Sequence, residues 1–173
     1  MGVSRRMLLR MGGAAMAVSA SSARALAAPA LIGLKELNAR TLSFDCYYTG
    51  EKLKKVTYWA DGKYEPTALT EINRTLRDYW SGEVHPIDPG VLDVLHRIGR
   101  ALETDGRFEI LCGYRSSKTN AALRRKDSQV AARSLHMDGK AVDFWLPDRR
   151  LSLVHKTALA QQRSKVLSAK GRC

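Results

Sequence analysis

A short stretch in the second half of the chain carries the residue types of a metal site. His136 and Asp143 stand seven residues apart on either side of Gly139. His136 precedes the apolar run 141–146, and Asp143 lies within it. A neutral imidazole nitrogen and a carboxylate oxygen both bind zinc at about 2.0 to 2.2 Å, and catalytic zinc sites use about three protein ligands and a water. The spacing therefore predicts two of the three protein ligands of a zinc site.

The apolar run is expected to form the strand that positions the carboxylate. Side chains alternate between the faces of a strand, so Val142 and Phe144 face the core and Asp143 faces an open groove. Gly139 lets the preceding loop fold back and bring His136 to that carboxylate. A charged group in an apolar strand is costly unless it is paired or metal-bound. The alternative is a surface histidine beside a salt-bridged strand carboxylate.

The third ligand is not evident in the sequence. A returning strand near the C-terminus would be the natural source of a second histidine, but His155 is the one histidine after His136. It follows Asp143 by only 12 residues and falls within a predicted helix. A structural or exposed helix histidine is the better interpretation. Residues 164–173 contain no histidine, acid or aromatic residue.

The remaining pattern predicts an α+β domain in which helices pack on a small antiparallel sheet. Alternating and helical apolar periodicities, with turn residues between them, define the elements. We expect a hairpin of strands over 41–48 and 54–59, helices over 66–82, 91–105, 118–126 and 151–167, and strands over 107–112 and 141–146.

The N-terminus predicts export. Ser4-Arg5-Arg6-Met7-Leu8-Leu9-Arg10 is a twin-arginine pattern, and residues 1–27 form a signal peptide with an apolar stretch too short and too interrupted to span a membrane. We therefore expect a periplasmic protein that meets the twin-arginine translocase during export and has no stable membrane span after cleavage. Removing residues 1–27 lowers the formal net charge from +12 to +8. A basic surface suits acidic wall polymers, and no nucleic-acid-binding motif accompanies it, so no nucleic-acid partner is expected.

The three cysteines define neither a metal knuckle nor a disulfide scaffold. Cys46 and Cys112 fall in predicted strands, where buried free thiols are expected, and Cys173 is the last residue. A bridge between Cys46 and Cys112 stays possible in an oxidising compartment.

The chain resembles exported YcbK-like murein endopeptidases of the zinc D-Ala-D-Ala peptidase superfamily. The superfamily pattern SxHxxGxAxD is matched at Ser134, His136, Gly139, Ala141 and Asp143. Three further segments resemble segments of the family and occur in the same order. Residues 48–51 resemble its early hairpin turn, residues 84–89 its loop between helices, and residues 113–116 its substrate-binding arginine segment. Tyr48 departs from the family, where a histidine tends to precede Thr-Gly-Glu.

The resemblance implies the hedgehog/D-Ala-D-Ala peptidase fold and a zinc peptidase that hydrolyses peptide cross-links of peptidoglycan. His136 and Asp143 match its Zn²⁺ ligands, and Arg115 matches the arginine that faces the substrate carboxyl or the developing oxyanion. With Arg115, Ser134 is expected to contact the peptide stems of the substrate. The family carries its third ligand and general base on a late strand, so neither is identified in this chain.

These expectations divide the chain into a signal peptide (1–27), a linker (28–40), a catalytic domain (41–163) and an atypical basic tail (164–173). The hypothesis is that the tail replaces the last strand of an ordinary zinc endopeptidase, which would impair catalysis and leave a sheet edge exposed. The alternative is a non-catalytic peptidoglycan-binding domain derived from the same fold.

Overall fold

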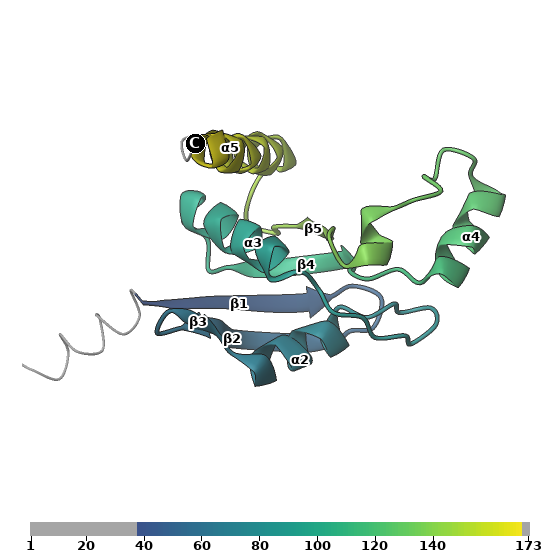
Figure 1. Ribbon diagram of the computed structural model, residues 1–173, viewed down its shortest axis with the longest axis horizontal. Helices are drawn as coiled ribbons and strands as arrows, with labels where there is room; N and C mark the ends of the chain where they lie inside the picture. The colour runs from purple at the N-terminus through teal and green to yellow at the C-terminus, as the bar shows by residue number, and fades with distance from the viewer. Residues whose placement is uncertain (1–37, 171–173) are drawn as a thin grey trace, which may run out of the picture. The chain divides into compact units, whose positions relative to one another are not determined.

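The structure is a computed structural model that describes the backbone of residues 38–170 and the side chains of residues 38–161. The predicted signal peptide, most of the predicted linker and the last three residues of the predicted tail lie outside this part of the chain. Five strands and four α-helices follow one another in the order shown in Figure 1.

The strands form one sheet in the order β3-β2-β1-β4-β5. Their bounds are β1 Ala39–Cys46, β2 Lys52–Ala60, β3 Lys63–Tyr64, β4 Arg107–Cys112 and β5 Asp143–Trp145. The α+β class is confirmed, but the sheet is mixed, because β4 pairs parallel to β1 while the other pairs are antiparallel. Two helices separate β3 from β4 along the chain, and such a crossover is what parallel pairing requires.

The helices cover the buried face of this sheet. Helices α2 (Pro66–Thr75) and α3 (Pro89–Ala101) contact β2 and β1, and α5 (Leu151–Lys170) packs on α3. Helix α4 (Ser117–Lys126) follows β4. The strands bury alternate residues, and the core is formed by Leu42, Phe44, Val56, Tyr58, Ile72, Leu76, Leu92, Leu95, Ile98, Phe108, Ile110 and Leu146. One sheet face is therefore apolar and covered, and the ends of β4 and β5 are free to carry polar groups.

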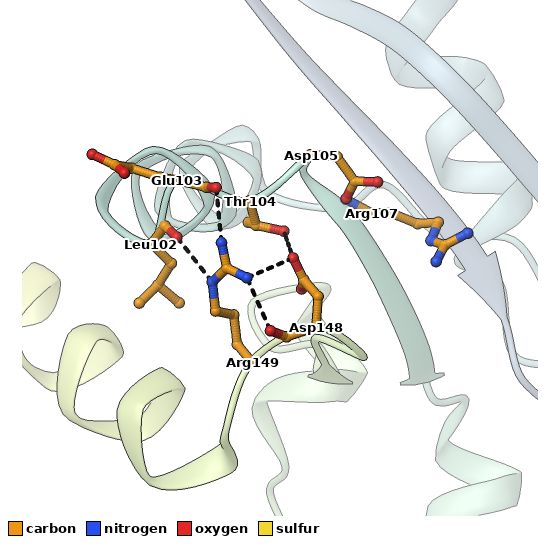
Figure 2. A network of polar contacts seen from close by, with 7 residues as sticks. All are labelled: Leu102, Glu103, Thr104, Asp105, Arg107, Asp148 and Arg149. Carbon is orange, nitrogen blue, oxygen red and sulfur yellow. Dashed lines mark hydrogen bonds and ion pairs between the residues drawn. The ribbon is translucent and has the colours of Figure 1, made fainter.

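A polar network fixes the chain where it leaves the sheet (Figure 2). The Arg149 guanidinium donates to the carbonyl oxygens of Leu102 at 3.0 Å and Glu103 at 2.8 Å, at the C-terminal end of α3. It also bonds Asp148, whose carboxylate accepts a hydrogen bond of 2.9 Å from Thr104. These carbonyls have no partner within the helix, so the arginine both caps α3 and holds the loop between β5 and α5.

Several elements differ from the sequence-based expectation: strand β3 was not expected, and helix α3 spans 89–101 where 91–105 was expected. Helix α2 ends at Thr75, because the Asp78 carboxylate accepts the backbone N–H groups of Trp80 and Ser81 and winds the chain into a turn. Strand β5 is three residues long, and a register irregularity at its partner Cys112 limits its ladder. Helix α5 continues to Lys170, so residues 164–170 of the predicted tail are helical.

Candidate metal centre

Three separate elements bring potential metal ligands together. Cys112 ends β4, Asp143 begins β5, and the two are partners in the antiparallel ladder. His136 lies on a short 3₁₀ helix, η1 (Leu135–Asp138). One ligand atom from each of these three residues lies within 4.8 Å of the other two. The Nε2 atom of His136 is 3.5 Å from a carboxylate oxygen of Asp143.

The loop that carries His136 is held from both ends. Ser134 caps η1, since its hydroxyl oxygen accepts the N–H of His136. Gly139 ends η1 with φ of +64°, and a Cβ at this position would collide with the carbonyl oxygen of Pro86. The Gly139 carbonyl accepts a hydrogen bond of 2.9 Å from the N–H of Asp88. Glycine is therefore required both by the left-handed backbone and by the close approach of the loop between α2 and α3.

The His136 ring is oriented by a second contact. Its Nδ1 lies 2.8 Å from the carbonyl oxygen of Gly113, and only an N–H can satisfy that acceptor. The contact leaves Nε2 directed toward Asp143, which is the tautomer and orientation expected of a metal ligand.

The pair is strongly coupled electrostatically. Burial lowers the pKa of His136, but hydrogen bonds with Asp143, Cys112 and the Gly113 carbonyl together outweigh burial and raise that pKa to about 10. The hydrogen bond with His136 lowers the pKa of Asp143. Without a metal the two groups form an ion pair, and a cation bound between them would displace the imidazole proton.

Arg115 lies beside this cluster on the loop between β4 and α4. Its guanidinium donates to Asn120 at 3.4 Å and to the Cys112 sulfur at 3.6 Å, and its backbone N–H donates to the carbonyl of His136 at 3.1 Å. Arg115, Cys112 and Asp143 line one cavity of about 190 Å³. The cavity thus combines a cationic side chain with two of the three potential ligands.

The buried carboxylate of Asp78 holds the loop that carries Arg115. Asp78 is 1% exposed and accepts the N–H of Ser116 at 2.9 Å. Burial raises the pKa of Asp78, but hydrogen bonds from Thr119 and Ser116 outweigh it and lower the pKa to about 2. With its oxygens occupied in this way, Asp78 positions the loop and is not free to act on a ligand.

Aromatic side chains also line the cavity. Tyr48 and Tyr79 stack with ring centroids 4.5 Å apart, and Trp80 lies next to Tyr79. Tyr48 occupies the position where the sequence departs from the family pattern, and it is exposed at the cavity wall.

The structure brings His136, Asp143 and Arg115 close together, and Asp143 and Arg115 line one cavity, while the chemical roles of all three stay predictions. Ser134 is explained locally by capping, and its contact with substrate stays a prediction. His155 lies exposed on α5 and outside the cluster.

Cys112 was expected from the sequence to be a buried apolar thiol, whereas in the structure it lies among the potential metal ligands. Cys112 is half-buried, and Cys46 and Cys112 are both free thiols, with no bridge between them. The pattern that would have revealed Cys112 is its position at the end of a strand three residues before Arg115. Its partner in the sheet could not be deduced from that position alone.

Comparison with known proteins identifies the family. The chain matches the family described as Peptidoglycan L,D-endopeptidase MepK (Peptidase_M15_2) over residues 35–166. It is 35% identical over 160 residues to the Peptidoglycan L,D-endopeptidase MepK of Escherichia coli strain K12, across 92% of this chain and 84% of that protein. It is 33% identical over 142 residues to the probable peptidoglycan L,D-endopeptidase MepK of Haemophilus influenzae, across 82% of this chain and 73% of that protein. No solved structure is significantly similar.

These similarities confirm the resemblance to exported murein endopeptidases that the SxHxxGxAxD pattern predicted. They extend beyond that pattern through most of the described domain. The chain therefore belongs to the MepK family of peptidoglycan L,D-endopeptidases.

Proposed function

We propose that this protein is a zinc-dependent endopeptidase that hydrolyses L,D peptide cross-links of peptidoglycan. The observation that carries the proposal is the pairing of Nε2 of His136 with the Asp143 carboxylate at 3.5 Å, beside the cavity that Arg115 lines. Membership of a family whose relatives are named for this activity supports the same substrate.

The residues present fit a zinc ion. Peptidases of this family are generally metal-dependent, and the cluster offers an imidazole nitrogen, a carboxylate oxygen and a sulfur, which are the donor types that zinc takes. When bound, zinc supplies a Lewis acid that polarises a scissile carbonyl and makes a water nucleophilic near neutral pH. His136 and Asp143 would hold it.

The protein's own groups perform the recognition. Arg115 carries a permanent positive charge at the cavity and can bind a stem-peptide carboxylate through two N–H groups, or stabilise the oxyanion that forms during hydrolysis. Its backbone hydrogen bond to the His136 carbonyl couples its position to the metal ligands. Asp78 keeps this loop in place.

The substrate places the activity outside the cytoplasm, and we propose that the twin-arginine pattern at Arg5 and Arg6 directs export to the periplasm. Within residues 38–170, no helix is both long enough and apolar enough to cross a membrane. The formal net charge of +8 that stays after removal of residues 1–27 favours association with anionic wall polymers.

The test is digestion of purified cross-linked peptidoglycan, with products identified by mass spectrometry. We expect cross-link cleavage that a chelator abolishes and added zinc restores. Substituting His136→Ala should lower cleavage to below about one hundredth, since even outer-shell partners of a metal ligand contribute 10- to 100-fold. His155→Ala is the matched control, because His155 is exposed on α5 and outside the cluster.

A second outcome would identify the non-catalytic alternative. If the purified protein sediments with peptidoglycan but cleaves no cross-link in the presence of zinc, the chain is a wall-binding domain and the proposed hydrolysis is wrong.

A further inference from the structure

We propose that the sulfur of Cys112 is the third protein ligand of the metal, so that the centre is formed by a cysteine, a histidine and an aspartate. The inference rests on the proposed function, because it concerns the same metal. This ligand would come from the end of β4, opposite Asp143 in the sheet.

The backbone places Cys112 for this role. It ends β4 directly opposite Asp143 in the ladder, and the register irregularity between Ile110 and Cys112 turns the strand at this point. One ligand atom from each of Cys112, His136 and Asp143 lies within 4.8 Å of the other two. Bond lengths of about 2.0 to 2.3 Å imply separations of roughly 3.3 to 3.8 Å between tetrahedral zinc ligands, so closing the cluster needs a movement of about 1 Å.

The surroundings of the sulfur favour a negatively charged ligand. The Arg115 guanidinium donates toward the Cys112 sulfur at 3.6 Å, so a fixed positive charge faces the atom that carries negative charge when it ligates a metal. Cys112 is half-buried and lines the same cavity as Arg115 and Asp143. The sulfur is therefore reachable by an ion entering from solvent.

The second described cysteine is more buried and lies away from the cavity and the cluster, although each of the two sulfurs donates to a backbone carbonyl, that of Cys112 to Gly113 at 3.7 Å. Cys46 is 8% exposed, its sulfur donates to the carbonyl oxygen of Thr75 at 3.5 Å, and it belongs to no cluster of potential ligands in the described part of the chain. It does not line the cavity of Arg115. Cys46 is thus a free thiol in the same sheet that serves as a matched control.

A sulfur ligand would also set the choice of metal. Thiolates favour zinc and cobalt over magnesium, calcium and manganese, which prefer oxygen ligands. One thiolate and one carboxylate neutralise the charge of a divalent ion. We therefore expect selective binding of zinc and cobalt even in an excess of magnesium.

Cobalt(II) reports the ligand directly, because a cobalt–thiolate bond gives an intense charge-transfer absorption in the near ultraviolet. The experiment uses the full-length chain with Cys173→Ser, which removes the cysteine outside the described residues. We expect one cobalt per chain with this absorption. The absorption should vanish with Cys112→Ser and persist with Cys46→Ser, and zinc affinity should fall at least about tenfold with Cys112→Ser alone.

A second readout needs no substitution in the site. Zinc should protect Cys112 from alkylation by iodoacetamide, as mapped by mass spectrometry, and a chelator should restore its reactivity. The proposal that Cys112 is a ligand would be overturned if one cobalt binds without charge-transfer absorption. It would also be overturned if bound zinc leaves the alkylation of Cys112 unchanged. If that cobalt still requires His136, the proposed peptidase stands. If the chain binds no metal at all, both proposals fall.

Discussion

The substitution Gly139→Ala tests how the histidine ligand is positioned. Gly139 has φ of +64°, a conformation that costs an alanine about 1 kcal/mol. The added Cβ would also collide with the Pro86 carbonyl. Relieving that collision moves the loop and breaks the 2.9 Å hydrogen bond between Asp88 and Gly139, a loss of about 1 kcal/mol. With the residual steric strain, we expect a total cost of about 3 kcal/mol.

Gly50→Ala separates the two contributions. Gly50 has φ of +69°, but nothing lies within 4 Å of a Cβ built there. It should therefore cost only the backbone penalty of about 1 kcal/mol. The difference of about 2 kcal/mol between the two variants measures the packing of the loop that carries His136.

The assay is urea denaturation followed by far-ultraviolet circular dichroism, with and without zinc. Gly139→Ala should also weaken zinc binding, because His136 and Asp143 no longer lie on a fixed loop, whereas Gly50→Ala should leave zinc binding unchanged. If Gly139→Ala destabilises the protein no more than Gly50→Ala, the reasoning about how the loop is held is wrong.

Three further predictions concern charge. Because the Asp78 pKa is lowered to about 2 in the folded state, its ionised form stabilises the protein above pH 4, and about 2 kcal/mol should be lost as pH falls through 2. Denaturation of the wild-type protein and of Asp78→Asn at pH 5 and pH 2 should show a smaller loss of stability in the variant. An equal loss in both proteins would contradict this prediction. Burial lowers the pKa of His136, but its hydrogen bonds with Asp143, Cys112 and Gly113 together raise that pKa to about 10, so zinc must displace a proton. Zinc affinity measured by calorimetry should rise about tenfold per pH unit between pH 6 and 8 for each proton released, and a constant affinity would be inconsistent with this site. Arg115→Lys should slow cross-link hydrolysis by about 10²- to 10³-fold with zinc content unchanged, and loss of zinc instead would show that the arginine acts by holding the metal site.

Local patterns in the sequence were sufficient for much of the fold. The alternation of Leu42, Phe44 and Cys46 predicted a half-buried strand, and these three residues are buried in β1. The expected outward direction of Asp143 agrees with its exposure beside half-buried Phe144. Such periodicities depend only on which face of an element meets the core, so they are readable from one segment at a time.

Features that depend on pairing between distant segments were not predicted. The parallel alignment of β1 and β4 follows from a crossover through two helices, which leaves no mark in either strand. The proximity of Cys112 and Asp143 depends on their register across β4 and β5. The early end of α2 depends on Asp78 accepting backbone N–H groups of the following turn. Each feature is fixed by contacts between residues whose types alone do not specify a partner.

The central claim is that His136 and Asp143 hold a catalytic metal, and the zinc content of the purified full-length chain tests it most directly. Mass spectrometry under native conditions, with elemental analysis, should find one zinc per chain, and none in His136→Ala or Asp143→Ala. His155→Ala should retain the metal. A zinc-free wild-type chain after incubation with excess zinc, or a zinc ion that survives His136→Ala, would contradict the account.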